Sequence, residues 1–402
     1  MLTDTLKEEI QAWRRKALLI GIAGLVISLL ALAISPSRFY QSWLVAYVLV
    51  FGLAAGGLSG VLLRHLAGGA WSVAIQRFCE AASRTLWVFA PLFLFLFLTG
   101  GTYLYPWTDP VYAASHPVVA NKTAYLNTGF FLLRFAACFA LWGLLAFLFN
   151  RWSARLDATG DPRYAVWMRR LSAPGMAAMF LSMTIAATDW GMSTEPEWYS
   201  TIYGPLWIVS QGLSILALSI IAITRMDGEP PLAQAMNHRQ YVNLGNLLLA
   251  FTVLWTYVAF SQFLITWSGN LPEEIGWYLN RRGGGLTGIS VLLALFHFLV
   301  PMIVLLFRQT KEGVLGLRQV AYLLLAMRVL DLYWNLVPSF PGQANRVDVW
   351  MVVSVLAAVA ALGGFWLRLF LGQLMKRPLL PVNDPRAEML LRRENREAHG
   401  HA

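Results

Sequence analysis

Charged residues are scarce in this sequence. Asp, Glu, Lys and Arg make up 13% of its 402 residues, which is about half of the roughly 25% found in an average soluble domain. Hydrophobic residues make up 57% of the chain. So few charges leave too little polar surface to cover a water-soluble globule. The composition therefore excludes a soluble multidomain protein and predicts that lipid covers most of the surface.

Residues that bind metals and redox centres are also scarce. The two cysteines, Cys79 and Cys138, lie far apart and form no Cys-x-x-Cys pair, which excludes an iron–sulfur cluster and a structural zinc site. Of the six histidines, two lie in the C-terminal tail. His65 and His297 are predicted at different membrane depths, so they do not form the facing pair that haem b needs. We therefore expect no cofactor in this chain.

Long apolar runs are abundant. A helix that crosses a bilayer needs about 20 mostly apolar residues, and ten segments meet this need: 17–35, 41–63, 85–104, 125–149, 174–190, 205–223, 243–267, 286–307, 319–334 and 348–371. They predict an all-α, polytopic integral membrane protein with a transmembrane domain over 1–375 and a polar cytoplasmic tail over 376–402. The first segment resembles a signal peptide in its basic start, but we expect it to be retained as an anchor.

The distribution of Lys and Arg predicts the orientation of these helices. The net charge is +10, but basic residues in short loops of a membrane protein set its topology, so nucleic acid is not an expected partner. With the N-terminus inside, 23 of the 31 Lys and Arg fall in inner segments and 5 in outer loops, the other three being Arg134, Arg328 and Arg368 within predicted helices. This bias predicts that both termini lie in the cytoplasm.

The outer loops are rich in Trp, Tyr and Pro, as at 105–107, 198–199 and 277–278. Part of this enrichment is the aromatic belt of any membrane protein. Loops 105–124 and 268–285, and the segment 189–204, are nonetheless longer than simple connections need to be. They predict a docking surface for partner subunits.

Ionisable residues at membrane depth are the best functional candidates, because placing each of them there costs a few kcal/mol. They fall into an outer and an inner set, separated by a mostly apolar layer that His297 comes closest to bridging. Within the outer set, Arg328 and Asp331 are spaced i, i+3 and can pair, and Arg134 can pair with Asp189. The candidates for a proton path are Asp331, Arg328, His297, Asp189, Glu195, Arg134, Gln262, His65 and Glu80.

Two interpretations of these residues stay open. Histidine titrates near neutral pH and a buried carboxylate can be tuned to do so, so these groups can relay protons across the bundle. Alternatively, the two Arg–Asp pairs lock helices together and His297 is a core residue. The aromatic residues of the outer loops likewise serve either as anchors and partner contacts or as stacking partners for a quinone.

Several longer strings are more specific than composition. They are HLAGGAW at 65–71, DWGMSTEPEWYSTIYG at 189–204, FSQFLITW at 260–267, GNLPEEI at 269–275 and MRVLDLYW at 327–334. Together, from about residue 41 to 372, they resemble the ActF subunits of alternative complex III, a bacterial quinol:electron acceptor oxidoreductase. The motif residues that match are His65, Asp189, Glu195, Gln262, His297, Arg328 and Asp331.

The resemblance implies an NrfD-like fold of ten helices, with two four-helix bundles plus flanking helices. It implies a non-redox subunit that supports assembly and conducts protons. The quinol, iron–sulfur clusters and c-type haems are then expected in partners: a homologous ActC-like quinol-binding subunit, an iron–sulfur subunit and multihaem cytochrome c subunits on the periplasmic side. Small membrane subunits and lipids complete the expected partners.

Two other functions are compatible with the residues. In the first, the chain itself holds the quinol site, as polysulfide-reductase-like proteins do, and needs a pocket near the periplasmic surface. In the second, it is a stand-alone secondary transporter, although few Gly or Pro residues interrupt the predicted helices at mid-membrane.

Overall fold

The structure is a computed structural model that describes residues 3–69, 71–230, 232–381, 383–385 and 388. Within these residues, ten helices are long and apolar enough to cross a membrane, and no strand is present. The predicted all-α, multi-pass fold is confirmed. Six spans are single α-helices: α1 (Asp4–Ile34), α2 (Pro36–Ala67), α7 (Thr128–Thr159), α9 (Tyr203–Arg225), α11 (His238–Gly269) and α17 (Val349–Leu374). A seventh is α8 (Pro162–Trp190), which the 3₁₀ turn η3 (Met192–Thr194) extends to Thr194.

The other three spans combine shorter elements. The third is α3 (Trp71–Ser83) and α4 (Phe89–Leu104), joined by the 3₁₀ turn η1 (Leu86–Val88), and the ninth is α16 (Val314–Leu336), which continues into η5 (Val337–Ser339). The eighth consists of α13 (Leu286–Leu292), the π-helical segment η4 (Leu293–Leu299) and α14 (Val300–Leu306). Short helices lie in the loops: η2 (Pro106–Thr108), α5 (Pro110–Ser115), α6 (Pro117–Ala120), α10 (Leu232–Ala235), α12 (Pro272–Leu279) and α15 (Arg308–Glu312).

Most of the spanning helices are longer than the apolar runs that predicted them. The 32 residues of α7 extend over about 48 Å at 1.5 Å per residue, whereas the hydrocarbon core is about 30 Å thick. Local signals outside the lipid decide where the helices end. At the turn between α7 and α8, Gly160 adopts a positive φ of 68° and Asp161 caps the next helix by accepting from the Arg163 backbone N–H.

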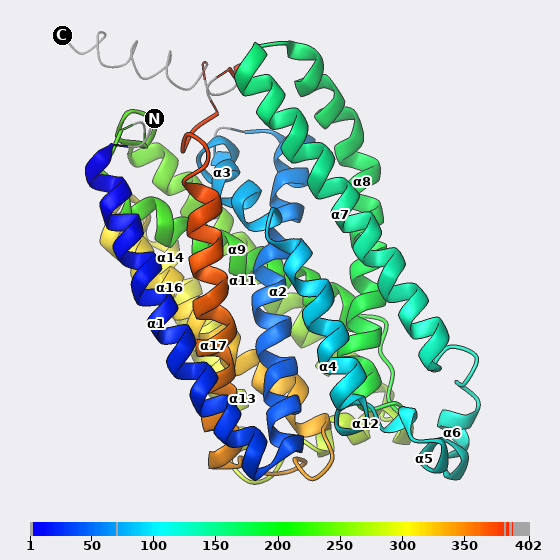
Figure 1. The fold of residues 1–402 in the computed structure, drawn as a ribbon. Coiled ribbons are helices and arrows are strands. Elements are labelled where there is room, and N and C mark those ends of the chain that lie inside the picture. The colour runs from blue at the N-terminus through cyan, green and yellow to red at the C-terminus, as the bar shows by residue number, and fades with distance from the viewer. Residues whose placement is uncertain (1–2, 70, 231, 382, 386–387, 389–402) are drawn as a thin grey trace, which may run out of the picture.

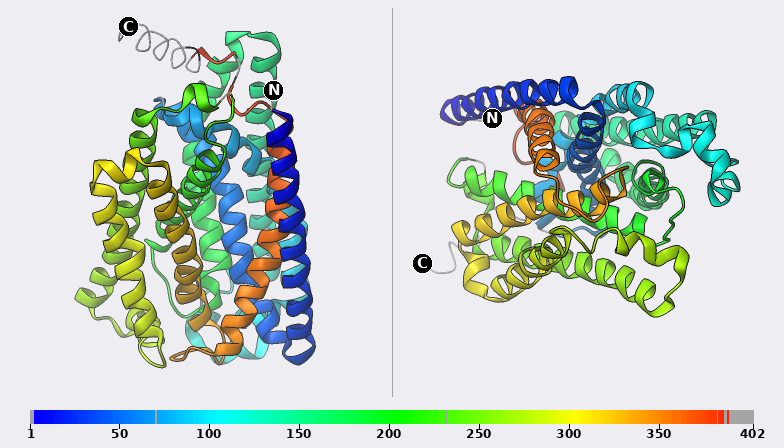
Figure 2. Two further views of the ribbon diagram at one scale, coloured as in Figure 1. Left: turned by 90° about the vertical axis from the view of Figure 1, so that its left-hand side faces the viewer. Right: turned by 90° about the horizontal axis from the view of Figure 1, so that it is seen from below.

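The helices pack as two groups of four with two flanking helices. The first group contains α2, α3 with α4, α7 and α8, and the second contains α9, α11, α13 with α14, and α16. The flanking pair, α1 and α17, packs along α2 (Figures 1 and 2). This arrangement agrees with the two four-helix bundles expected from the sequence.

Small residues allow the close contact between the two flanking helices. A Cβ added at Gly24 in α1 would lie 2.5 Å from the backbone nitrogen of Ala361 in α17, and one added at Gly364 would lie 2.6 Å from the oxygen of Ala17. Helix pairs in membranes associate through such close backbone packing, because lipid tails provide no hydrophobic driving force between helices.

The first helix begins and the last helix ends at the same end of the molecule, as Figure 1 shows. We call this end the terminal face and the opposite end, where α5, α6 and α12 lie, the loop face. The described part of the predicted polar tail packs onto the terminal face, since Leu379 and Leu380 are buried there. The rest of the tail lies outside the described residues.

Candidate functional site

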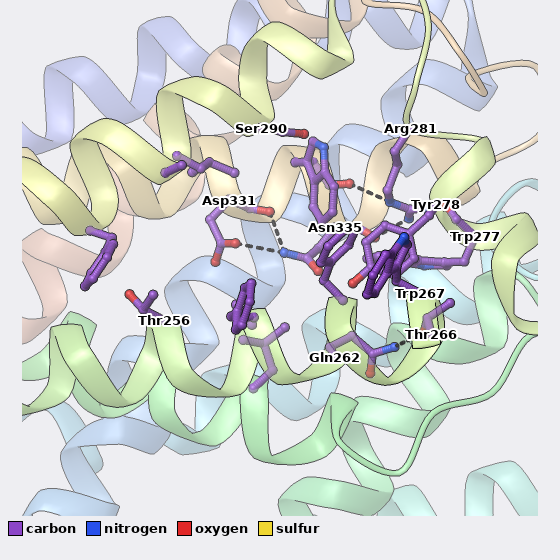
Figure 3. Close-up of a pocket in the computed structure, with 18 of the residues that line it drawn as sticks. Thr256, Gln262, Thr266, Trp267, Trp277, Tyr278, Arg281, Ser290, Asp331 and Asn335 are labelled. Carbon is purple, nitrogen blue, oxygen red and sulfur yellow. Dashed lines mark hydrogen bonds between the residues drawn. The ribbon is translucent and has the colours of Figure 1, made fainter. Parts of the chain in front are cut away.

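A cavity of about 900 Å³ lies in the second helix group, between mid-membrane and the loop face. Side chains from α11, α12, α13, η4 and α16 line it, and most of them are apolar or aromatic (Figure 3). The aromatic ones are Trp255, Tyr257, Phe260, Phe263, Trp267, Trp277, Tyr278, Phe298 and Trp334. Tyr257, Phe260 and Trp267 are 58–68% exposed, so the cavity opens towards the outer surface of α11, which faces lipid.

One wall of the cavity carries the strongest polar groups. The predicted pairing of Arg328 with Asp331 is confirmed: an Arg328 guanidinium N–H donates to Asp331 Oδ2, and both side chains are buried. The second carboxylate oxygen accepts from Asn335 Nδ2 at 2.8 Å. Asp331 and Asn335 both line the cavity, so a buried ion pair is reachable from it.

Asn335 also presents an acceptor with no partner. Its side chain is 4% exposed, and its Oδ1 has no hydrogen-bond partner among the described residues. Buried polar atoms are satisfied in about 90% of cases or more, so an exception needs an explanation. A ligand hydroxyl in the cavity is one explanation, because Asn335 is part of its lining.

His297 lies behind this wall. Its ring stacks on Trp255, with 4.0 Å between ring centroids, and Trp255 in turn lines the cavity. His297 is fully buried and belongs to the π-helical segment η4. Wide π turns within α-helices are frequent at functional sites. The sequence analysis did not predict this widened turn, although Pro301 was a usable signal, because a proline has no N–H to donate to the carbonyl of His297 four residues earlier.

Gln262 lies on the opposite wall, on α11. Its side-chain carbonyl accepts a hydrogen bond from Ser200 Oγ, and its Nε2 donates to Thr266 Oγ1 at 3.2 Å. Ser200 belongs to the string at 189–204, so that string contacts the cavity lining from the loop between α8 and α9. Trp198 of the same string stacks on Trp277, with ring centroids 4.8 Å apart.

Arg281 joins the cavity to the surface of the loop face. Its guanidinium lies 3.5 Å above the ring of Trp277 and donates to the backbone oxygens of Trp334 and Asn335 at 3.0 and 2.8 Å. Burial lowers the pKa of Arg281 to about 10, although the nearby Glu195 carboxylate opposes the shift. The residue nevertheless stays protonated at neutral pH.

Glu195 receives hydrogen bonds on both carboxylate oxygens, from Asn280 Nδ2 at 2.9 Å and from Ser339 Oγ at 2.9 Å. Its Oε2 lies 3.8 Å from Arg281 Nη1. Glu195 therefore connects the loop after α8 with the loops that follow α12 and α16. The predicted residues Asp331, Arg328, Gln262, His297 and Glu195 thus surround one site.

The predicted pair Arg134–Asp189 is confirmed as an ion pair, but it lies elsewhere, between α7 and α8 of the first group. Arg134 donates from Nε and Nη2 to the two oxygens of Asp189 at 2.8 and 2.9 Å. The guanidinium also lies 3.7 Å from the centroid of the Tyr125 ring and donates to the backbone oxygen of Tyr125 at 3.0 Å. This geometry joins two helices of the first group and does not reach the cavity lining.

Glu80 and His65 lie near the terminal face. Glu80 accepts from Gln76, Arg77 and Ser153 at 2.7 Å each and from Arg377 at 3.0 Å. Arg77 also donates to both oxygens of Asp157 at 2.6 Å. We call this group the Glu80 cluster. It joins α3, α7 and the segment after α17, while the ring of His65 packs 5.7 Å from that of Phe149.

Sequence reasoning missed several residues of these sites. Arg281 was counted only as a loop charge, although an arginine three residues after Tyr278, on the side with few basic residues, was a usable signal. Asn335 and Trp255 gave no signal, because nothing in one sequence says which side chains face a cavity. Arg377 and Asp157 were not among the candidates, yet both are partners in the Glu80 cluster.

These observations define the class of the protein: it is a multi-pass helical membrane protein with a lipid-facing aromatic cavity. Comparison with protein families and with curated proteins finds no match. Among the described residues, no three His, Cys, Asp or Glu side chains come together closely enough to hold a metal ion.

Proposed function

We propose that the chain is a membrane subunit of a respiratory quinol:electron acceptor oxidoreductase of the alternative complex III type, with an NrfD-like fold. In this proposal the subunit has no redox centre, supports assembly and conducts protons. One observation carries it. Four of the five strings on which the resemblance rests lie within residues 189–334. Gln262 and Asp331 of these strings line one cavity, and Glu195 lies 3.8 Å from Arg281 of its lining. Such convergence is what a shared function of these residues requires.

Proton transfer between the cavity and the loop face is supported by a series of close polar contacts. Asp331 accepts a hydrogen bond from the Asn335 side chain, and the backbone oxygen of Asn335 accepts one from Arg281. The Arg281 guanidinium lies 3.8 Å from the Glu195 carboxylate. Asp331 and Glu195 are the two carboxylates of this series. Water between them would complete a path, since a carboxylate can take up and release a proton when its environment tunes it.

The Glu80 cluster supplies the polar groups at the terminal face. His297 is fully buried and stacks on Trp255 of the cavity lining, and in this proposal it links the Asp331 site with the Glu80 cluster. We assign the terminal face to the cytoplasm of a bacterial inner membrane, because the basic residues concentrate there. An ActC-like subunit would then lie beside this chain in the membrane. The iron–sulfur and multihaem cytochrome c subunits would dock on the loop face.

The proposal is tested by Asp331→Asn in the intact complex, reconstituted into proteoliposomes. Quinol oxidation and proton translocation are followed together. We expect quinol oxidation to continue while proton translocation falls, with no change for Glu273→Gln, an exposed carboxylate on the loop face. If both activities are unchanged in a fully assembled Asp331→Asn complex, proton conduction by this residue is wrong and a scaffolding role is the better account.

The cavity favours a second candidate function, in which this chain itself binds a quinol headgroup. Its volume of about 900 Å³ falls within the roughly 300–1,000 Å³ of small-molecule sites. Aromatic walls suit a planar ring, the lipid-facing mouth suits an isoprenoid tail, and Asn335 Oδ1 is an acceptor for a quinol hydroxyl. The adjacent Asp331 carboxylate is placed to receive its proton.

This second function predicts that quinone accompanies the chain when it is purified alone. Asn335→Leu and Trp334→Ala should each lower the retained quinone at least severalfold, whereas Val253→Ala at the apolar rim should change it little. Lipid in place of quinone in every variant would exclude quinol binding. The same preparation distinguishes a stand-alone transporter, which would purify from its own membrane as a complete unit without cytochromes.

A further inference from the structure

A second, smaller cavity lies on the α7–α8 hairpin, away from the sites described above. It has a volume of about 250 Å³, and its lining residues come from both helices near their shared turn. It is lined by Phe147, Leu148, Arg151, Trp152, Arg155, Tyr164 and Trp167. Arginine and aromatic side chains dominate this lining, which contains no acidic residue, whereas Asp331 lines the large cavity.

The depth of this cavity follows from the exposed residues of α7. Leu144 and Phe147 are 55% and 57% exposed, so their apolar side chains face the hydrocarbon. One turn further, Arg151 is exposed, and Arg155 follows at the next turn. The cavity therefore lies where the apolar surface gives way to charge, which is the headgroup layer of the membrane.

Arg151 and Arg155 have no anionic partner among the residues that the structure describes. They are spaced i, i+4 and thus project from one face of α7. Neither guanidinium forms a hydrogen bond or ion pair with a described residue. The Arg151 guanidinium carbon lies 5.7 Å from the centroid of the Phe147 ring. The acidic residues nearest to them in the sequence, Asp157 and Asp161, accept hydrogen bonds from other groups. Asp157 binds Arg77 through both oxygens, and Asp161 caps α8.

The rest of the lining is suited to a lipid headgroup. Trp167 lies 5.7 Å from Trp152 and 5.4 Å from Tyr164 between ring centroids, and the three rings form one wall. Trp and Tyr favour the membrane–water interface because one edge of each ring is polar and the body is apolar. Basic pockets on the cytoplasmic side of helix bundles bind lipid phosphates.

We propose that this cavity binds the headgroup phosphate of an anionic phospholipid, with Arg151 and Arg155 as the phosphate ligands. The aromatic wall contacts the glycerol region, and the acyl chains lie along the exposed apolar surface at Leu144 and Phe147. Because the charge faces the headgroup layer, a membrane lipid rather than a free phosphate is the occupant.

The experiment measures lipid retention by the full chain in nanodiscs that contain equal amounts of phosphatidylglycerol and phosphatidylethanolamine. After extraction into detergent, the lipids that stay bound are counted by native mass spectrometry. We expect phosphatidylglycerol to be enriched. The double variant Arg151→Gln/Arg155→Gln should lower its retention by roughly thirtyfold, since each basic residue near an anionic surface contributes about 1 kcal/mol and every 1.4 kcal/mol is about a factor of ten. Trp167→Ala should weaken retention without removing a charge.

Arg169→Gln is the matched control. Residues 151 and 169 lie nine positions before and after Gly160, so on antiparallel helices they share one membrane depth, and Arg169 is exposed but not part of the cavity lining. It should retain phosphatidylglycerol like the unchanged chain. Equal losses in Arg169→Gln and the double variant would reduce the effect to general surface charge and overturn the proposal. So would unchanged retention in the double variant, or full displacement of the lipid by millimolar inorganic phosphate.

Discussion

The buried Arg134–Asp189 pair offers a quantitative test of whether its role is structural. Arg134 is 8% exposed and uses three N–H groups, two on Asp189 and one on the Tyr125 oxygen. Asp189→Ala removes the acceptor of two of these hydrogen bonds and leaves the guanidinium charge buried. Breaking a buried ion pair from one side costs about 3–5 kcal/mol, and we expect a loss of that size in the free energy of unfolding.

Replacing both partners should behave differently. In Arg134→Met/Asp189→Leu no charge stays buried, and exchange of a buried pair for apolar residues of similar volume is often neutral or stabilising. We therefore expect the free energy of unfolding of the double variant to lie within about 1 kcal/mol of that of the unchanged chain. The assay is equilibrium unfolding in mixed micelles, analysed as a double-mutant cycle.

An exposed pair of the same chemistry provides the control. Arg308 Nε lies 2.7 Å from Glu312 Oε1, but the Arg308 side chain is 80% exposed. The matching double-mutant cycle at this pair should give a coupling energy of at most about 1 kcal/mol. If Asp189→Ala costs no more than the exposed substitution, or if the buried double variant is as unstable as the single one, the structural interpretation of the Arg134–Asp189 pair is refuted.

Three further predictions concern packing and the two ends of the bundle. Gly24→Val should destabilise the protein by about 1–3 kcal/mol through overpacking, because its Cβ would lie 2.5 Å from the backbone nitrogen of Ala361. Gly143→Val is the control, since a Cβ at Gly143 would meet no neighbouring atom within 4 Å. A thermal unfolding scan compares the two variants. Glu80→Gln should release the segment after α17, which Arg377 attaches to Glu80, so limited proteolysis near Leu379 should become faster, whereas the exposed Glu8→Gln should not change it. Arg281→Lys should lower the free energy of unfolding by about 1–3 kcal/mol, since a lysine lacks the planar set of donors that satisfies several buried acceptors; the exposed neighbour Arg282→Lys should have little effect, and equal losses at both positions would contradict the argument.

The ten spans and their approximate positions could be predicted from the sequence because each depends on a local property, the apolarity of about 20 consecutive residues. The pairing of Arg328 with Asp331 was predictable for the same reason, since residues at i, i+3 share a helix face. Helix ends were predicted less well, because caps such as Asp161 lie outside the apolar runs.

The sites depend on contacts between distant segments, and these were only partly predictable. The strings at 189–204 and 260–275 indicated important residues, but nothing in the sequence placed Ser200 on Gln262 or Glu195 beside Arg281. The polar tail was expected at the membrane surface, and its Arg377 instead reaches the buried Glu80. One residue type can be a surface charge or a buried partner, and only packing distinguishes the two.

By itself, then, the sequence determined that this protein crosses a membrane ten times, and that its polar residues within the membrane are few enough to be functional candidates. The physical reason is the free-energy cost of placing polar groups in lipid. This cost and the thickness of the bilayer apply to each segment separately. The tertiary structure alone decided that Gln262 and Asp331 line one cavity, and that three further candidates contact its lining. It also decided that Arg134 with Asp189 and the Glu80 cluster lie apart from it. Helix rotation and crossing, which depend on side-chain packing between segments far apart in the chain, determine which polar groups meet and which space between them stays open.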